Sequence, residues 1–230
     1  MAAAKNHILE QLPRLVRARL MSLCEPVQLV LADVLCEPGA PFTHVYFPTE
    51  GFISLITLLD GHTGLEVGMV GFEGMLGAEL VLGVDSTPLR ALVQGAGAAW
   101  RIDAAVFRKE LVGNKALHQL LSRYLFVRMA QLASSAACLR FHLIGPRLAR
   151  WLLMTQDRAR ADSFQVTQEF LAYMLGVRRV GVTSAARALQ HSGLIEYHRG
   201  ELTVLDRKGL EAASCGCYAS EQLAYSTMFP

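Results

Sequence analysis

Three arginines, Arg178, Arg179 and Arg187, lie close together in a segment that carries no opposing charge. Between Gly176 and Gly193 the chain has no aspartate or glutamate. A helix face that merely contacts solvent usually mixes both signs at spacings of three and four residues. A face of one sign is what contact with phosphate groups requires. The segment therefore indicates binding of a polyanion; the alternative is an ordinary helical hairpin with a solvated charged face.

Two helical patterns on either side of Gly176 would position these arginines. Their apolar residues recur at helical spacing; they are Leu171, Ala172, Met174 and Leu175, then Val182, Ala185, Ala186 and Leu189. Gly176 lies at the turn, where a positive φ is favoured. Two helices joined in this way are the pattern of a helix-turn-helix, whose second helix can enter the major groove of DNA. The runs LIEYH and ELTVL flank Arg199-Gly200 and predict a β-hairpin, and hence a wing.

Composition limits the other possibilities. The 230 residues carry a formal net charge of +2 and are 52% hydrophobic, which is ample for packed cores. Because the whole chain is nearly neutral, any affinity for nucleic acid must come from a local patch. No apolar run approaches the roughly 18 residues of a membrane span, and the N-terminus lacks the long apolar core of a secretory signal. We therefore expect a cytoplasmic protein with no membrane partner.

Short apolar runs separated by turn signals fill residues 26–102. The runs are VQLVLA, HVYFP, GFISLITLL, LEVGMV, LRALVQ and AAWRI. Many short strands at this spacing predict an antiparallel sandwich or jelly-roll barrel. A helical pattern over 6–24 precedes the runs, and a helix over 104–112, which Asp103 can cap, follows them. The predicted class is α+β.

A long helical pattern without glycine or proline runs from about Lys115 to Leu143. Its apolar residues are too many for one narrow face, so we expect burial on two sides. One side would pack on the barrel, and the other would form a dimer seam or pack wholly inside one subunit. We favour the seam, because paired helix-turn-helix units fit half-sites about one DNA turn apart. Residues 158–163 are expected to be a polar connector, and the tail after Leu210 to be partly loose.

A barrel, a long helix and a winged helix-turn-helix, in this order, resemble the Crp/Fnr family of bacterial transcription regulators. The resemblance is strongest from Gly145 to Leu205. It implies a cyclic-nucleotide-binding-like jelly-roll sensor domain over 1–113, a dimerisation helix over 114–144 and a winged DNA-binding domain over 145–230. It also implies a homodimer on an inverted-repeat operator in double-stranded DNA, with RNA polymerase as a further partner.

The resemblance implies roles for individual residues of a recognition helix at about 178–192. The family's base-reading positions correspond to Arg179, Val180 and Ser184. Arg179 is the candidate for bidentate pairing with a guanine, whereas Val180 and Ser184 differ from the best-known branch and predict a different operator. The residues expected at phosphates or neighbouring bases are Arg178, Thr183, Arg187, Thr167 and Gln168.

Cyclic-AMP-binding members carry a phosphate cassette of Gly-Glu, a short helix and Arg-Ser-Ala. The matching segments here keep the frame but lose the chemistry, because Ala78 takes the glutamate position and Thr87-Pro88 take the Arg-Ser positions. We therefore expect a different small effector, or none, and the cofactor stays unknown. The residues of this possible pocket are Gly77, Ala78, Glu79, Thr87, Pro88, Arg90 and Leu132. Nearby Glu66 and Glu73 are expected at solvated loops and rims.

Other chemistries have weak signals. The spacing Cys215-x-Cys217 could hold a metal, but without a nearby histidine or further cysteine we predict no metal site. No Ser/His/Asp elbow, P-loop or dinucleotide fingerprint is present, so we predict no catalytic residue and no enzyme. The rival hypothesis is a small-molecule- or metal-binding jelly-roll module whose C-terminal domain contacts protein instead of DNA.

Overall fold

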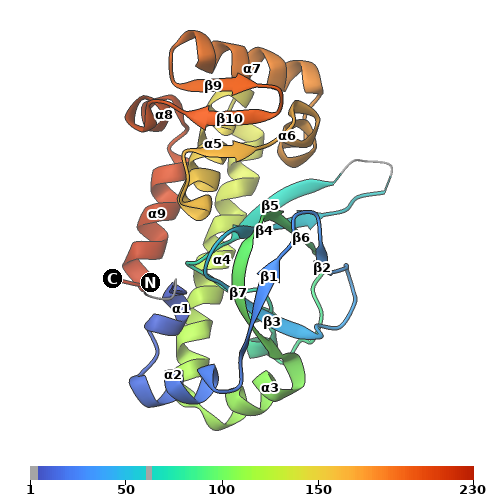
Figure 1. The fold of residues 1–230 in the computed structure, drawn as a ribbon, viewed down its shortest axis with the longest axis vertical. Helices are drawn as coiled ribbons and strands as arrows, with labels where there is room; N and C mark the ends of the chain where they lie inside the picture. Colours follow the sequence, from blue (N-terminus) through green and yellow to red (C-terminus); the bar gives the residue numbers. More distant parts are fainter. Residues whose placement is uncertain (1–4, 61–63) are drawn as a thin grey trace.

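The computed structural model describes residues 5–60 and 64–230. A β-rich part and a helical part lie at the two ends of an elongated molecule, and one long helix runs along both (Figure 1). Among the described residues, no helix has the length and apolar character that a membrane span requires.

Two antiparallel sheets form the predicted barrel. One sheet has the order β1-β7-β3, from strands Glu25–Leu29, Gly97–Asp103 and His44–Pro48; the other has the order β2-β6-β4-β5, from Val34–Cys36, Arg90–Gly95, Phe52–Thr57 and Leu65–Val70. Side chains of both sheets, such as Phe47, Ile53 and Ile102, share one buried core. The mixed α+β architecture with an N-terminal barrel is thus confirmed.

Strand β4 is buried on both faces, which explains why its sequence is apolar almost throughout. Ile53 and Leu55 belong to the core of the barrel, whereas Phe52 and Ile56 belong to a second core that includes helix α5, Ile144–Ala159. Alternate residues of a strand point to opposite faces. The outer face of the barrel is therefore also a packing surface for the C-terminal half.

The predicted N-terminal helix over 6–24 is wrong in its continuity, because Pro13 divides it into α1, His7–Glu10, and α2, Arg14–Met21. Proline lacks the N–H that a helix interior needs and is tolerated only near a helix start. After the barrel, Asp103 caps α3, Ala104–Gly113, by accepting from the backbone N–H groups of Ala105 and Val106, as predicted.

The long helix α4, Lys115–Phe141, packs on the barrel along a buried row of Leu117, Leu121, Tyr124 and Val127. A short 3-10 helix, η1 (Ala78–Leu82), and β5 lie against it. Two-sided packing of this helix is confirmed, but part of the second side is covered by the same chain.

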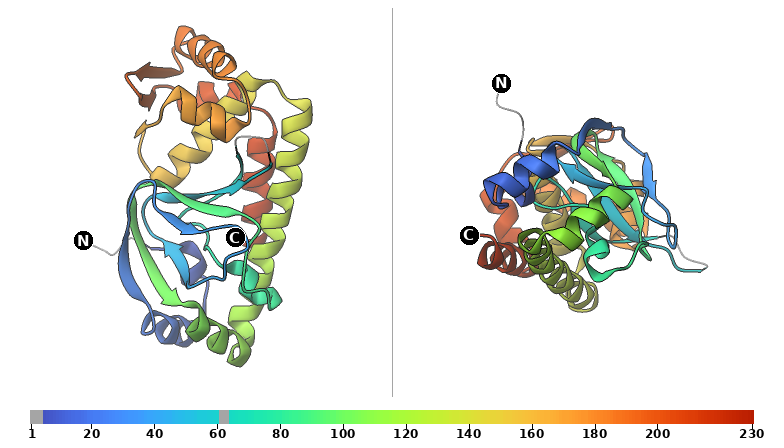
Figure 2. Two further views of the ribbon diagram at one scale, coloured as in Figure 1. Left: turned by 90° about the vertical axis from the view of Figure 1, so that its right-hand side faces the viewer. Right: turned by 90° about the horizontal axis from the view of Figure 1, so that it is seen from below.

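That cover is α9, Cys217–Met228, which runs alongside α4 (Figure 2). The expectation of a loose tail after Leu210 is wrong: α8, Arg207–Ala213, is followed by α9, and Phe229 is only 4% exposed. The Tyr225 hydroxyl donates to the Glu73 carbonyl at 2.7 Å, and the Phe229 ring stacks on the Tyr225 ring. Contacts with distant segments, which the tail's own pattern does not contain, fix its place.

Between α5 and α8 the chain forms α6, Gln168–Leu175, then α7, Arg179–His191, and a three-stranded sheet. The sheet has the order β8-β10-β9, from Ser163–Gln165, Glu201–Val204 and Ile195–His198. The hairpin β9–β10 is the predicted wing. Part of the expected polar connector over 158–163 is instead the end of α5 and the start of β8, which pairs with β10.

Candidate nucleic-acid interface

Helices α6 and α7 meet at a sharp turn that Gly176 makes possible. The φ of Gly176 is 62°, and the N–H groups of Gly176 and Val177 donate to the carbonyls of Tyr173 and Ala172 at 3.2 and 3.0 Å. This is the Schellman arrangement, whose left-handed residue is best filled by glycine. The turn sets the direction in which α7 leaves.

The buried face of α7 consists of the residues predicted for it, Val182, Ala185, Ala186 and Leu189. The side chains of Arg178, Arg179 and Arg187 are exposed on the other face. In the described part of the chain, no salt bridge involves these three arginines. Helix α7 lies at the end of the molecule away from α2 and α3, with no described element beyond it (Figure 1). The arrangement presents positive charge of one sign on an open helix face.

The residues predicted to read bases are also exposed. Val180 is 72% exposed, and Ser184 is exposed one turn further along α7. With Arg179, they form a patch of one cation, one apolar group and one hydroxyl. The structure brings the three side chains to one accessible surface.

Thr183 and Gln168 contact each other. The Thr183 hydroxyl lies 2.6 Å from Gln168 Oε1 and 3.0 Å from the Arg179 carbonyl, so its single proton has two acceptors within reach. Both residues are half-buried. Their visible role is to join α6 to α7, which leaves less of each side chain free for a phosphate than the sequence suggested.

Thr167 caps the start of α6. Its Oγ1 accepts from the Phe170 N–H at 3.1 Å, and its side chain is exposed. Because the oxygen acts as an acceptor, the hydroxyl proton can still donate to an anion. This placement suits the predicted phosphate contact at the N-terminus of the helix.

The wing turns at Arg199-Gly200, both with positive φ, of 49° and 86°. Such a pair is typical of a two-residue hairpin turn. His198 and Arg199 are exposed at this tip. Sequence analysis did not place them among the site residues, although a basic residue in a predicted wing was a usable signal. The Tyr197 hydroxyl donates to the Val166 carbonyl at 2.7 Å and ties the wing to the segment before α6.

The possible effector residues form no evident anion site. Gly77 and Ala78 are buried at the start of η1. Thr87 is only 2% exposed, and its hydroxyl oxygen accepts from the Leu89 N–H. Arg90 Nε lies 2.9 Å from Glu37 Oε2 in an ion pair. The remaining members of this set are Glu79, which is half-buried, Pro88, which is exposed, and Leu132, which is exposed on α4.

Glu66 and Glu73 do not lie at solvated rims, and this expectation is wrong. Trp151 Nε1 donates to Glu66 Oε1 at 2.9 Å, and Arg158 Nε donates to Glu73 Oε1 at 2.8 Å. Burial raises the pKa of Glu66 to about 7. Both carboxyl groups come from the barrel and both partners from α5. They therefore connect the barrel to the helix that carries the helix-turn-helix.

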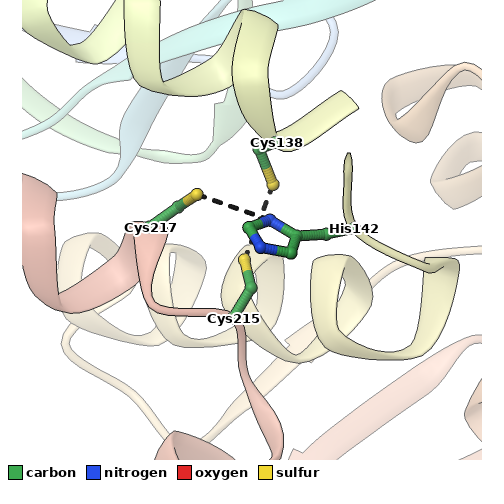
Figure 3. A group of neighbouring side chains, drawn as sticks. All are labelled: Cys138, His142, Cys215 and Cys217. Atoms are coloured by element: carbon green, nitrogen blue, oxygen red, sulfur yellow. Dashed lines mark hydrogen bonds between the residues drawn. The ribbon is translucent and has the colours of Figure 1, made fainter. Parts of the chain in front are cut away.

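Four potential metal ligands lie together where α4 ends. Cys138, His142, Cys215 and Cys217 place one ligand atom each within 4.8 Å of all the others, and their side chains point toward one another (Figure 3). The prediction that Cys215-x-Cys217 has no histidine or further cysteine nearby is wrong. The missing pair comes from another helix, so no spacing in the sequence could have shown it.

A family model describes part of the chain. Residues 146–213 match the Crp-like helix-turn-helix domain. No curated protein matches the chain in sequence at a significant level.

Solved structures match most of the chain. FixK2 from Bradyrhizobium japonicum is similar with a TM-score of 0.70 and 15% identity, over 84% of this chain and 98% of that one. The c-di-GMP responsive global regulator CLP from Xanthomonas campestris gives a TM-score of 0.67 and 17% identity, over 84% and 100%. A transcriptional regulator of the CRP family from Thermus thermophilus, TTHB099, gives 0.66 and 18%, over 82% and 96%.

Proposed function

We propose that this DNA-binding transcription regulator recognises its operator as a cytoplasmic homodimer, with α7 of each subunit in the major groove. The proposal starts from the Crp-like helix-turn-helix domain and the similarity to Crp/Fnr structures. The observation that carries the proposal is the exposed face of α7, where Arg178, Arg179 and Arg187 are free of carboxylate partners in the described structure. Such a face can reach base edges and phosphates without first breaking an internal ion pair.

Within this face we assign two kinds of contact. Arg179, with Val180 and Ser184 beside it, reads bases, because a guanidinium can pair bidentately with a guanine and an apolar side chain can pack on a thymine methyl. Arg178 and Arg187 neutralise phosphates, with help from Thr167 at the start of α6. Since only one of the base-reading groups is charged, we expect the operator to differ from that of regulators with three charged groups at these positions.

The homodimer is supported by an apolar strip on α4 that the other described residues leave open. Phe126 and Met129 are 56% and 67% exposed, and the exposed Ala133 and Ala136 continue the strip at spacings of three and four residues. This spacing is typical of a helix seam between two subunits, and the small alanines permit a close approach. Two copies joined along α4 would present two α7 helices to one duplex, which predicts an inverted repeat.

Binding of a fully randomised duplex library at low salt tests the proposal, with selection by gel shift and sequencing of the retained DNA. We expect enrichment of an inverted repeat whose half-sites lie about one helical turn apart. The matched control is the triple variant Arg178→Ala, Arg179→Ala, Arg187→Ala, whose changes are all on the exposed face and should leave the fold intact. Failure of the native protein to retain any DNA would favour the rival in which the C-terminal domain contacts protein.

The wider biology follows from the same assignment. We also propose that RNA polymerase is a partner of the protein and that the barrel is the part that responds to a signal. The cassette has Thr87 and Pro88 at the positions of the arginine and serine, and the nearby Arg90 is paired with Glu37. We therefore propose that any effector of the barrel is chemically different from cyclic AMP.

A further inference from the structure

We propose that Cys138, His142, Cys215 and Cys217 form a binding site for a single tetrahedral metal ion, of which Zn²⁺ is the best fit. All four ligand atoms lie within 4.8 Å of one another. None of the four residues belongs to α7 or to the cassette segments of the barrel, so the site does not depend on the DNA-binding assignment.

The distances agree with one ion at the centre. Cys138 Sγ lies 3.5 Å from Cys215 Sγ, and Cys217 Sγ lies 3.6 Å from His142 Nδ1. With Zn–S of about 2.3 Å and Zn–N of about 2.0–2.1 Å, a tetrahedron has edges of about 3.8 Å between two sulfurs and about 3.5 Å between sulfur and nitrogen. The four side chains converge on a common point (Figure 3). These two edges are within a few tenths of an ångström of the tetrahedral values, and the remaining pairs, all within 4.8 Å, would have to close by up to about 1 Å around an ion.

Two rigid helix ends hold the ligands. Cys138 and His142 are four residues apart at the C-terminal end of α4, where the His142 N–H donates to the Cys138 carbonyl at 3.1 Å. Residues at this spacing lie on the same face of a helix. Cys215 precedes α9 and Cys217 is its first residue, so the two thiols flank the start of the second helix.

Shielding from solvent and a nearby cation also suit a closed site with sulfur ligands. Cys138 and Cys215 are 1% and 6% exposed, which protects their sulfurs from bulk solvent. Three thiolates, one neutral imidazole and one divalent cation carry a net charge of −1. Arg147 and Arg150 line the same small cavity as Cys138. Arg150 is already paired with Glu221, whereas no salt bridge among the described residues involves Arg147, so Arg147 offsets part of the excess charge that a loaded site would have.

The ligand types select the metal class. Three sulfurs and one imidazole are a known donor set of closed, structural zinc sites, whereas Mg²⁺ and Ca²⁺ require oxygen ligands. A cluster of two or more irons would distribute these ligands over separate metal atoms, which the tight grouping of all four does not favour. The protein supplies all four ligands of a tetrahedral ion, so the site is of the closed type and leaves no position for a substrate.

A disulfide between Cys138 and Cys215 is the competing chemistry. Their sulfurs are 3.5 Å apart, well beyond the bond length of about 2.05 Å, and the structure has both as free thiols. A disulfide would also leave Cys217 and His142 without a role. The presence of four converging donors, where two would suffice for a disulfide, favours the metal.

The experiment is to purify the full chain under reducing conditions without chelator and measure bound metal by plasma mass spectrometry. We expect about one zinc per chain, and replacement by Co²⁺ should give thiolate-to-cobalt charge-transfer bands in the near ultraviolet and the strong visible bands of tetrahedral cobalt. Cys217→Ser should lower the zinc content at least tenfold under competition with a chromogenic chelator. Cys24→Ser, at a half-buried cysteine outside the group, is the matched control and should keep its zinc.

Other results would overturn the proposal. They are a zinc content near zero in native protein even after incubation with Zn²⁺, Co²⁺ spectra without thiolate bands, and a Cys138–Cys215 disulfide in protein alkylated under anaerobic conditions. Because Cys217→Ser could unfold the chain, its circular dichroism is compared with that of the native protein. The cobalt spectrum of the native chain decides the question without any variant.

Discussion

The indole Nε1 of Trp151 donates a hydrogen bond to Glu66 Oε1 at 2.9 Å, across 85 positions of the chain. Glu66 belongs to β5 of the barrel, and Trp151 belongs to α5, which leads into the helix-turn-helix. The two halves of the molecule thus meet at a titratable carboxyl group. Its neighbours include Ser54, which donates to the carboxyl, and the guanidinium groups of Arg150 and Arg158.

The first prediction concerns pH and this contact. Burial raises the pKa of Glu66 to about 7 from an ordinary value of 4.5, so the folded state holds a proton that the unfolded state loses. The stabilising contribution of the protonated form is complete below pH 4.5 and is lost as the pH rises to about 7. The free energy of unfolding should fall by about 3 kcal/mol from this group between these values.

Glu66→Gln removes the titration while keeping an oxygen that accepts from Trp151. Urea unfolding of both proteins at several values between pH 4.5 and 7.5 measures the difference. We expect the variant to lose less stability than the native chain over this range. Equal slopes in the two proteins would show that Glu66 does not titrate in this window.

The second prediction is for Arg179→Ala. Loss of a bidentate pair should cost about 1–3 kcal/mol on the selected operator and relax the base preference at one position of each half-site. Binding curves on the operator and on its single-base variants measure both effects. An equal loss on unrelated DNA would identify Arg179 as a phosphate contact only.

The third prediction is for Arg187→Ala, which should weaken binding to all sequences alike. Each phosphate that is no longer neutralised should lower the slope of log K against log salt concentration by about one unit. Affinities at several salt concentrations give the slope. Gln190→Ala, at an exposed neutral position of the same helix, is the control and should leave it unchanged. An unaltered slope in Arg187→Ala would remove this residue from the phosphate set.

The fourth prediction concerns the seam on α4. Met129→Glu places a charge in the middle of the exposed apolar strip and should convert the proposed dimer into monomers, visible by light scattering during gel filtration. The same change at Val112, which is 92% exposed on α3 and outside the strip, is the control. If both variants stay dimeric, the subunits meet through another surface.

The fifth prediction concerns stability and the metal. If an ion binds only the folded chain, a free ion concentration of about a hundred times its dissociation constant stabilises the fold by about 2.7 kcal/mol. For a chain of this size, that should raise the Tm of metal-free protein by about 5–10 °C on addition of Zn²⁺. Thermal unfolding of native protein and Cys217→Ser, with and without Zn²⁺, measures the effect. A Tm increase of the same size in Cys217→Ser would place the binding elsewhere.

The parts of the fold that were predicted correctly depend on local signals. Strand β3 has the bounds of the run HVYFP, β5 has those of LEVGMV, and the turn at Gly176 follows from one glycine between two amphipathic patterns. The exposed arginines of α7 belong to the same class, because a helix with one apolar face determines which residues remain outside. Such signals lie within a few residues of the structure that they specify.

The parts that were missed depend on contacts between distant segments. Strand β8 is only three residues long and depends on its pairing with β10. The position of α9 depends on its packing against α4 and the barrel. The metal ligands show this most clearly, since 77 positions separate Cys138 from Cys215. A sequence pattern cannot show which helix end will come to face a C-x-C pair.

Phe229, which follows α9, is buried in the same core as the first strands of the barrel. During synthesis, a growing chain therefore leaves the ribosome with this core unfinished until the segment around Phe229 has emerged. Polypeptides terminated before this segment should therefore lack part of the barrel core and be cleaved by proteases faster than the full chain.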